Sequence, residues 1–171
     1  FSLVTGVQTC ALPICQYQEF RGIVQDLMDN EAFLRLENCS HHYGVSRKQH
    51  CINVAYYSYL MCKRMGLNYE AAARAGLLHD LFYYDWSDAG LGAVKHALLH
   101  SRIALKNAQK ITELSELEKD IIKNHMWLCG MIWPRHKEAY VVSMVDKICA
   151  VWEASYGIYA QMRLKLAFER Y

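Results

Sequence analysis

The sequence predicts an all-α, single-domain helical bundle, and three observations predict it. Only two prolines occur in 171 residues, while Ala, Leu, Met and Lys are frequent, which favours helix. Apolar residues recur at helical spacing in most segments. The sequence contains no alternating strand pattern of useful length and no internal repeat. A chain of this length supports one domain with a real hydrophobic core.

The first residues of the chain differ from the rest. Residues 1–14 carry no charge, and polar residues interrupt their apolar run, so they lack the features of a secretory signal. Read back into codons, residues 4–14 resemble a common sequencing adapter in translation. We therefore expect residues 1–14 to be an artefactual leader, and residues 15–171 to form the domain. The alternative is a genuine disordered leader, which an uninterrupted native gene encoding these residues would establish.

Three helices are expected in the first half of the domain. Residues 19–36 place apolar side chains at helical spacing. A capping serine opens the helix expected over residues 46–66, and a glycine closes it. The next helix is expected over residues 68–84, with an asparagine as its cap. Residues 85–94, which carry glycines and an aspartate, are expected to form a loop.

The second half is expected to add three or four helices. Residues 100–110 have a helical pattern, and residues 115–127 open with a serine followed three residues later by glutamate, a capping-box pattern. A glycine and a proline predict a break around residues 129–137. Residues 138–170 then form one long helix, or two joined at Gly157.

Charge and cysteine content exclude several classes of protein. The formal net charge is only +2, which does not favour binding to a nucleic acid polymer or a membrane surface. No apolar run approaches the length that spans a bilayer. We expect a cytoplasmic protein whose thiols are free and mostly buried. The cysteines outside the leader and its junction are Cys39, Cys51, Cys62, Cys129 and Cys149.

Eight histidines are present, and one of them belongs to an unusual pair. His79 and Asp80 lie together in the apolar stretch "AGLLHDLFYY". Buried polar groups need partners, and a buried carboxylate needs a cation, so this doublet calls for an explanation. A buried ion pair would be one explanation, but such pairs seldom recover their desolvation cost. A metal ion shared by both side chains is the other.

An ordered set of motifs resembles the HD-domain metal-dependent phosphohydrolase superfamily. That superfamily places a His on one helix, a His-Asp doublet on the next and an Asp on a later helix, and some members insert two further histidines. The resemblance covers about residues 40–152. The matching residues are His50 in "SRKQHCINVA", His79 and Asp80 in "GLLHDLF", His100 in "LLHSRIALKNA", His125 in "IIKNHMW" and Asp146 in "MVDKICA".

The resemblance implies a site for one or two divalent metal ions. Imidazole and carboxylate ligands suit Mn, Fe, Co, Ni and Zn, and the lack of thiolates argues against a structural zinc site; Mg is a further candidate. The first ion would be held by His50, His79, Asp80 and Asp146. Asp80 would bridge to a second ion held by His100 and His125.

The same resemblance implies which residues take part in catalysis. His79 and Asp80 would hold the ion that activates a water molecule for attack on phosphorus. Lys147 directly follows the last ligand, and it either contacts a substrate phosphate or is a solvated charge. Trp127, Trp133 and Pro134 would either wall a pocket for a base or belong to the core.

Some histidines are left outside the ligand set, and some residues depart from the superfamily pattern. His100 is preferred over His96, although the two would share a face of one helix; His41, His42 and His136 are read as ordinary surface or hydrogen-bonded residues.

The doublet is followed by Leu81 and Phe82 instead of Ile-Gly-Lys, with Asp85 and Asp88 nearby. Ser101 stands where proline is familiar. The absence of a Gly-Tyr-Pro triplet disfavours the cyclic-dinucleotide-specific branch.

These features predict a metal-dependent phosphohydrolase that acts on a small phosphate ester, most simply a nucleotide. No nucleic acid polymer or membrane is expected as a partner, and the oligomeric state is open. Two alternatives remain. One is a di-iron oxygenase on an HD scaffold, which oxygen uptake would identify. The other is a non-catalytic nucleotide-binding regulatory module, which would bind ligand without turnover.

Overall fold

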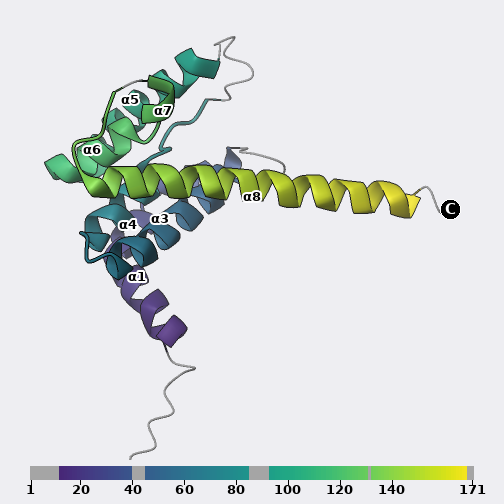
Figure 1. Ribbon diagram of the computed structural model, residues 1–171, viewed down its shortest axis with the longest axis horizontal. Helices are drawn as coiled ribbons and strands as arrows, with labels where there is room; N and C mark the ends of the chain where they lie inside the picture. Colours follow the sequence, from purple (N-terminus) through teal and green to yellow (C-terminus); the bar gives the residue numbers. More distant parts are fainter. Residues whose placement is uncertain (1–11, 40–44, 85–92, 131, 169–171) are drawn as a thin grey trace, which may run out of the picture.

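The computed structural model describes residues 12–39, 45–84, 93–130 and 132–168 (Figure 1). Every element of the described part of the chain is a helix or a 3₁₀ turn and none is a strand, so the predicted all-α class is confirmed. The elements in chain order are α1 (Leu12–Met28), α2 (Glu31–Leu34), a 3₁₀ turn η1 (Arg35–Asn38), α3 (Arg47–Arg64), α4 (Tyr69–Leu78), α5 (Ala93–Ile111), α6 (Glu116–Asn124), α7 (Trp127–Gly130) and α8 (Lys137–Phe168).

The long helix α8 organises the bundle. It packs against α3 on one side and against α6 on the other, and α3 and α4 form the most extensive helix pair. In Figure 1, α5, α6 and α7 lie above α8, while α3, α4 and α1 lie below and behind it. The region where α3, the end of α4, α6 and α8 meet is therefore surrounded by helices, and the core side chains of these helices are buried there.

The predicted helix starts are confirmed by side-chain caps. The Ser46 hydroxyl accepts a hydrogen bond from the Gln49 amide at 3.2 Å, and the Asn68 side chain accepts one from the Ala71 amide at 3.0 Å. Before α6, Ser115 accepts from the Glu118 amide at 3.2 Å, and the Glu118 carboxylate accepts from the Ser115 amide at 2.8 Å. These side chains satisfy amides that the first helical turn leaves without a partner.

The first expected helix, over residues 19–36, is interrupted. Helix α1 begins at Leu12 and ends at Met28, and the Asn30 side chain then caps the short helix α2 by accepting from the Ala32 amide at 2.9 Å. Asparagine competes with the helical backbone through this kind of bond, which explains the break. The apolar spacing across residues 19–36 is nevertheless used, since Phe20, Val24 and Phe33 are buried.

Other helix boundaries also differ from expectation. Helix α4 ends at Leu78, so the His-Asp doublet lies in the turn that follows, and residues 81–84 are not helical. Helix α5 begins at Ala93, earlier than the expected residue 100. The predicted break at residues 129–137 contains the end of the short helix α7. Helix α8 runs through Gly157 without a joint, as one of the two alternatives expected.

Helix α8 starts where it does because Asp120 of α6 holds the chain before it. The Asp120 carboxylate accepts hydrogen bonds from the backbone amides of Arg135 and His136 at 2.8 Å and 3.0 Å, and it lies 2.9 Å from the His136 Nδ1 atom. Burial would raise the pKa of Asp120, but His136 and the other donors outweigh it and lower the pKa. His136 is therefore a structural residue, as expected.

Free thiols are confirmed among the described cysteines. Cys51, Cys62 and Cys149 are free and buried, Cys39 is half-buried, and Cys15 is exposed. Burial raises the pKa of Cys62 to about 12 and that of Cys149 to about 11, so both remain neutral thiols near pH 7. The side chain of Cys129 and residues 85–92 of the expected loop lie outside the described residues, while residues 93–94 of that loop belong to α5. Across the described segments, no helix has the length and apolar character that crossing a bilayer requires.

The close approach of α3 and α4 depends on Gly76. A Cβ atom at this position would lie 3.1 Å from the Ala55 Cα atom and 3.4 Å from its backbone nitrogen, which is tighter than ordinary contact. The residue three positions before His79 therefore has to be small. The Gly76 carbonyl oxygen also lies 2.7 Å from the His79 Nδ1 atom, so the same glycine supports the doublet.

Replacing Gly76 with valine is expected to lower the free energy of unfolding by about 1–3 kcal/mol, because the added atoms overpack a backbone contact. Chemical denaturation measures this change. Gly22→Ala on α1 is the matched control, since nothing lies within 4 Å of its Cβ position. That variant should gain about 0.5–1 kcal/mol from reduced backbone entropy. Equal stability of Gly76→Val and the wild type would show that α3 and α4 can separate at no cost.

Candidate metal centre

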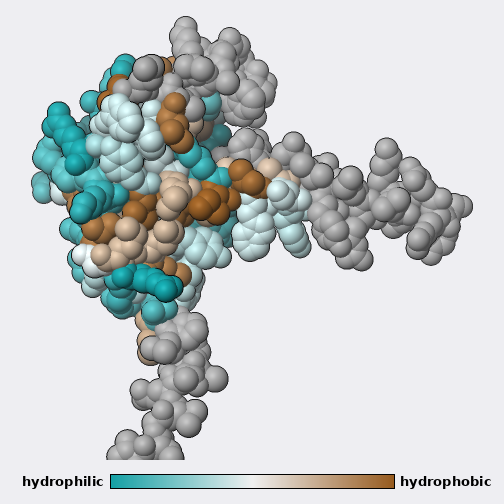
Figure 2. Space-filling view, in the orientation of Figure 1, coloured by the Kyte–Doolittle hydropathy of each residue, from teal (hydrophilic) through white to brown (hydrophobic). Residues whose placement is uncertain are grey.

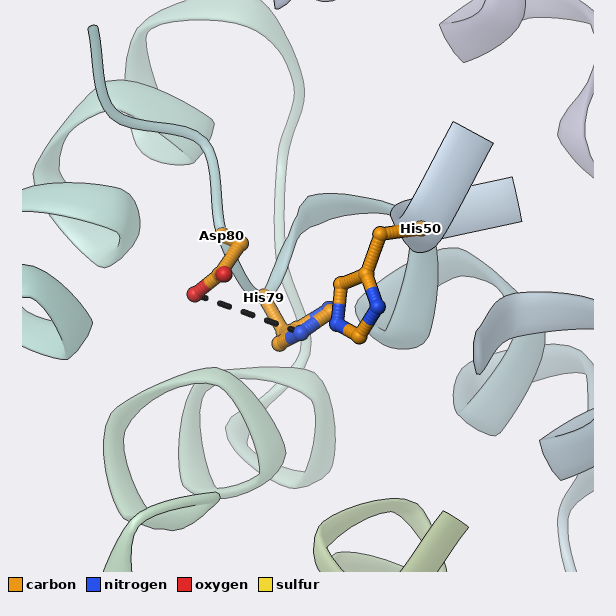
Figure 3. Close-up of side chains that lie close together, drawn as sticks. All are labelled: His50, His79 and Asp80. Carbon is orange, nitrogen blue, oxygen red and sulfur yellow. Dashed lines mark ion pairs between the residues drawn. The ribbon is translucent and has the colours of Figure 1, made fainter. Parts of the chain in front are cut away.

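The structure brings all six predicted ligands together between the helices. They come from different elements: the first turns of α3, the turn after α4, α5, the end of α6 and the middle of α8. All six are buried. We call His50, His79, Asp80, His100, His125 and Asp146 the histidine–aspartate cluster. Figure 3 shows three of its members, His50, His79 and Asp80, and the dashed line joins the last two.

Asp80 lies at the centre of this cluster. Its Oδ1 atom is 3.3 Å from His100 Nε2 and 3.6 Å from His125 Nε2. The same oxygen is 4.0 Å from His79 Nε2. The Oδ1 atom of Asp146 lies 3.1 Å from His50 Nε2 and 3.6 Å from His79 Nε2. Two carboxylate oxygens are therefore each surrounded by imidazole nitrogens.

Three overlapping groups within the cluster have the geometry of a metal site. In each group the ligand atoms lie within 4.8 Å of one another. Asp80 and His79 each belong to two groups, and so does His125, which the sequence had assigned only to a second ion. The groups are His50, His79 and Asp80; His79, His125 and Asp146; and Asp80, His100 and His125.

Backbone carbonyls orient three of the four imidazoles. The Nδ1 atom of His79 lies 2.7 Å from the Gly76 oxygen, and that of His125 lies 2.8 Å from the Ile122 oxygen. The Nδ1 atom of His100 lies 3.0 Å from the His96 oxygen. A carbonyl only accepts, so each Nδ1 donates a proton, and each Nε2 points into the cluster. This is the orientation that metal-binding histidines adopt.

The donor set fits a cation. The Nε2 atoms of His100 and His125 are only 2.9 Å apart. Two lone pairs cannot share that space without a proton or a metal ion between them. His79 Nε2 and Asp80 Oδ1 are buried without a hydrogen-bond partner, and such atoms are costly in a protein interior. Nitrogen and oxygen ligands without thiolates suit Mn, Fe, Co, Ni or Zn.

The electrostatics of the cluster also favour a cation. Burial would raise the pKa of Asp80 and of Asp146, but neighbouring histidines outweigh it and hold both pKa values well below their usual range. Burial would lower the pKa of His50, yet the carboxylates of Asp146 and Glu153 raise it to about 9. Both aspartates are thus anionic, and positive charge is required among them. A bound metal ion would displace the protons that otherwise provide it.

His125 behaves differently from His50. Burial, and then electrostatic repulsion from the neighbouring imidazoles, lower the pKa of His125 to about 3. Its imidazole is therefore neutral near pH 7. A neutral imidazole can offer its Nε2 lone pair to a metal ion without first losing a proton.

Lys147 lies at the edge of the cluster and supports it. Its ammonium group is 3.2 Å from Asp146 Oδ2, 2.9 Å from the His125 carbonyl oxygen and 3.2 Å from the Ser143 hydroxyl. Three protein acceptors match the three protons of an ammonium group. Lys147 is thus partly buried in an ion pair and is not simply a solvated charge. Its predicted contact with a substrate phosphate stays a prediction.

The remaining histidines lie as expected or outside the described residues. His96 is half-buried one turn before His100, its ring contacts the His100 ring, and its Nδ1 atom is 3.3 Å from the Tyr84 hydroxyl. It belongs to none of the metal-like groups of the described residues. The predictions for His41, His42, Asp85 and Asp88 fall outside the described residues.

An apolar groove of about 700 Å³ runs between α7 and α8. Trp127 and Lys147 line it, together with apolar residues of α8. Trp127 is thus a pocket wall, while Trp133 packs against it with ring centroids 5.0 Å apart and does not line the groove. Pro134 is buried and does not line the groove. Figure 2 shows apolar residues gathered along α8 where it crosses the body of the protein.

Sequence reasoning missed two residues beside the cluster, Glu153 and Asn53. Glu153 lies 2.8 Å from His50 Nδ1, and Asn53 donates a 2.8 Å hydrogen bond to the Glu153 carboxylate. Glu153 comes two turns after Asp146 on one helix face, a spacing that could have revealed it. Arg47 lies one turn before His50, with its guanidinium 3.8 Å from the Phe82 ring centroid and 2.8 Å from the Phe82 carbonyl oxygen. Nothing in the sequence distinguishes this buried arginine from exposed ones.

Comparisons with known proteins agree with this geometry. A family model described as HD domain matches residues 47–151. A curated relative, Ribonuclease Y of Symbiobacterium thermophilum, is 33% identical over 110 residues. That match covers 63% of this chain but only 19% of the relative, so the chain corresponds to a small part of that protein. No solved structure matches the chain.

Proposed function

The chain belongs to the HD domain family, and from this premise we propose that it is a metal-dependent phosphohydrolase acting on a small phosphate ester. A nucleotide is the proposed substrate class, and the proposed cellular location is the cytoplasm. The site uses neither a serine nor a cysteine nucleophile in this proposal. The proposed ligands come from elements far apart in the sequence, and α3, the turn after α4, α5, the end of α6 and α8 each place one or two of them.

One observation carries the proposal: buried nitrogen and oxygen atoms of the cluster converge, and the hydrogen bonds of the protein do not satisfy them. His79 Nε2 and Asp80 Oδ1 lack a hydrogen-bond partner, and the Nε2 atoms of His100 and His125 are 2.9 Å apart. A purely structural cluster would be expected to pair these atoms, because each buried unsatisfied polar group costs about 1–3 kcal/mol. Cations bound at the two proposed positions would give all four atoms a partner.

The cluster divides between two proposed ions. His50, His79, Asp80 and Asp146 are proposed to hold the first ion. His100 and His125 are proposed to hold the second, with Asp80 bridging the two. His125 also lies close to His79 and Asp146, so it is near both positions. When bound, a divalent ion supplies Lewis-acid chemistry, since it neutralises charge on a phosphoryl oxygen and makes a water molecule more acidic.

The protein's own residues orient the site and keep it dry. Lys147 holds Asp146 Oδ2, so the Oδ1 atom of the same carboxylate faces His50 and His79. Burial of His79 and Asp80 keeps competing water away from the ligand atoms. The low dielectric around them strengthens their attraction for a cation and for charge that develops on phosphate.

The test is a substrate panel with the full chain after reconstitution with Mn²⁺, Fe²⁺, Co²⁺, Ni²⁺ or Mg²⁺. The panel contains phosphomonoesters, phosphodiesters, nucleotides and a short RNA, which is included because the relative is named as a ribonuclease. We expect release of phosphate or of a nucleotide that depends on added metal and stops with a chelator. Preference for a small ester over RNA would support the proposed substrate class.

Other outcomes would identify the alternatives. Metal binding and nucleotide binding without turnover on any ester would contradict the hydrolase and favour a regulatory module. Consumption of oxygen by the iron-loaded protein would favour an oxygenase. Cleavage of RNA alone would keep the hydrolase but overturn the small-ester substrate class.

A further inference from the structure

His50 differs from the other three histidines of the cluster in the group that its Nδ1 atom contacts. Its Nε2 atom lies 3.1 Å from Asp146 Oδ1, and its Nδ1 atom lies 2.8 Å from Glu153 Oε2. The Nδ1 atoms of the other three histidines face backbone carbonyls of their own helices. His50 alone among them therefore depends on a charged side chain from another helix for its orientation.

The position of His50 in α3 explains this difference. His79 and His125 lie at the ends of α4 and α6, where the last carbonyls have no intrahelical partner and can accept from Nδ1. His50 lies near the start of α3, and the Ser46 carbonyl already accepts from the His50 backbone amide at 3.1 Å. A helix start offers few free carbonyls, and the acceptor that the structure provides for His50 Nδ1 is the Glu153 carboxylate of α8.

Glu153 is well placed to be that acceptor. It lies two turns beyond Asp146 on α8, so both carboxylates point at α3. The Glu153 side chain is buried, and its second oxygen accepts a 2.8 Å hydrogen bond from Asn53, one turn after His50 on α3. Both oxygens of Glu153 are thus engaged by α3, and the carboxylate has little freedom to rotate away from His50.

We propose that Glu153 is a positioning residue for the metal centre, which accepts the Nδ1 proton of His50 and thereby directs the Nε2 lone pair toward the first ion. This inference rests on the metal centre of the proposed function. The negative charge of Glu153 also makes the His50 imidazole a stronger donor to a cation, as carboxylates behind metal-binding histidines do. Glu153 itself does not contact the ion or the substrate.

The experiment measures Co²⁺ binding to the metal-free full chain by calorimetry and by the visible absorption of the bound ion. We expect Glu153→Ala to weaken Co²⁺ binding by about 10- to 100-fold and to change the absorption spectrum. Glu153→Gln keeps an oxygen that can accept the Nδ1 proton, so its loss should be smaller. Nitrogen NMR is done on protein loaded with Zn²⁺ instead of Co²⁺. His50 should be protonated at Nδ1 in the wild type and should be a mixture of tautomers in Glu153→Ala.

A double-mutant cycle separates positioning from a general effect on the fold. In a His50→Ala background, Glu153→Ala should have no further effect on Co²⁺ affinity, because the residue through which it acts is absent. Glu118→Ala is the matched control. Glu118 is also a buried glutamate, with an exposed fraction of 6% against 8% for Glu153, but it pairs with Arg74 away from the cluster. It should lose stability while Co²⁺ affinity stays at the wild-type value.

The outcomes distinguish this inference from the proposed function. If the wild type binds Co²⁺ tightly and both Glu153 variants bind it equally well, the inference is wrong and the metal centre stands. An equal loss in the presence and absence of His50 would also overturn it. If the wild type binds no divalent ion, the proposed function fails first. Should Glu153→Ala not fold, the Glu153→Gln titration decides the question.

Discussion

Replacing Asp80 with asparagine is expected to abolish metal binding and hydrolysis. The asparagine side chain has the same shape but no charge, and its amide protons would face imidazole nitrogens. The Asp80 Oδ1 atom lies 3.3–4.0 Å from three Nε2 atoms, and it is the proposed bridge between the ions. Loss of a residue behind a ligand costs about 10- to 100-fold in metal affinity, so loss of the bridging ligand should cost at least about 100-fold.

Metal content after dialysis and metal-dependent release of phosphate measure this effect. Thermal unfolding gives a second measurement, because an ion present at about 100 times its dissociation constant should add about 2.7 kcal/mol to the wild type and almost nothing to Asp80→Asn. Asp120→Asn is the matched control, since Asp120 is also a buried aspartate but binds the chain before α8. A metal content of Asp80→Asn equal to that of the wild type would refute the site.

Replacing His100 with alanine is expected to remove one of two ions. His100 belongs only to the group with Asp80 and His125, whereas the other two groups do not contain it. The ligands of the first ion should therefore remain in place. Elemental analysis should find two equivalents of metal in the wild type and one in the variant. Turnover should fall by about 100-fold or more, which is the usual cost of removing one preorganised electrostatic group.

The control for this variant is His96→Ala. His96 lies one turn earlier on α5, and the acceptor that it offers to His100 Nδ1 is a backbone carbonyl, which alanine retains while the ring contact is lost. We expect two equivalents of metal in this variant. A wild type with a single equivalent, or a His100→Ala variant that keeps two, would contradict the assignment of a second ion to His100 and His125.

Much of the fold was predictable because helix starts are chemically local. Ser46, Asn68 and Ser115 cap their helices with their own side chains, and the residues whose amides donate these bonds follow within one turn. Helix ends were less predictable. The apolar pattern continues through His79 into residues 81–84, yet α4 ends at Leu78. Leu81 and Phe82 are buried although they are not helical. Their apolar side chains therefore indicated burial correctly but did not indicate a helix.

The candidate site was predictable in its members but not in its geometry. The ordered set of motifs, read through the resemblance, named the six residues that the structure brings together as the histidine–aspartate cluster. It did not identify that His125 lies close to both proposed ions, or that Lys147 directs its protons to Asp146, Ser143 and the His125 carbonyl. Glu153 was missed because a glutamate on a helix is usually solvated, and only its spacing from Asp146 indicates a shared face.

By itself, the sequence determined the helical class, the starts of three helices and the kinds of ligand that the chain can offer, because these depend on neighbours within one or two turns. Only the tertiary structure decided which nitrogen of each imidazole faces the centre and which carboxylate stands behind His50. Those choices depend on how α3, α4, α5, α6 and α8 are rotated and how closely they cross. Core contacts such as that of Gly76 with Ala55 set this arrangement, and they join residues distant in the chain.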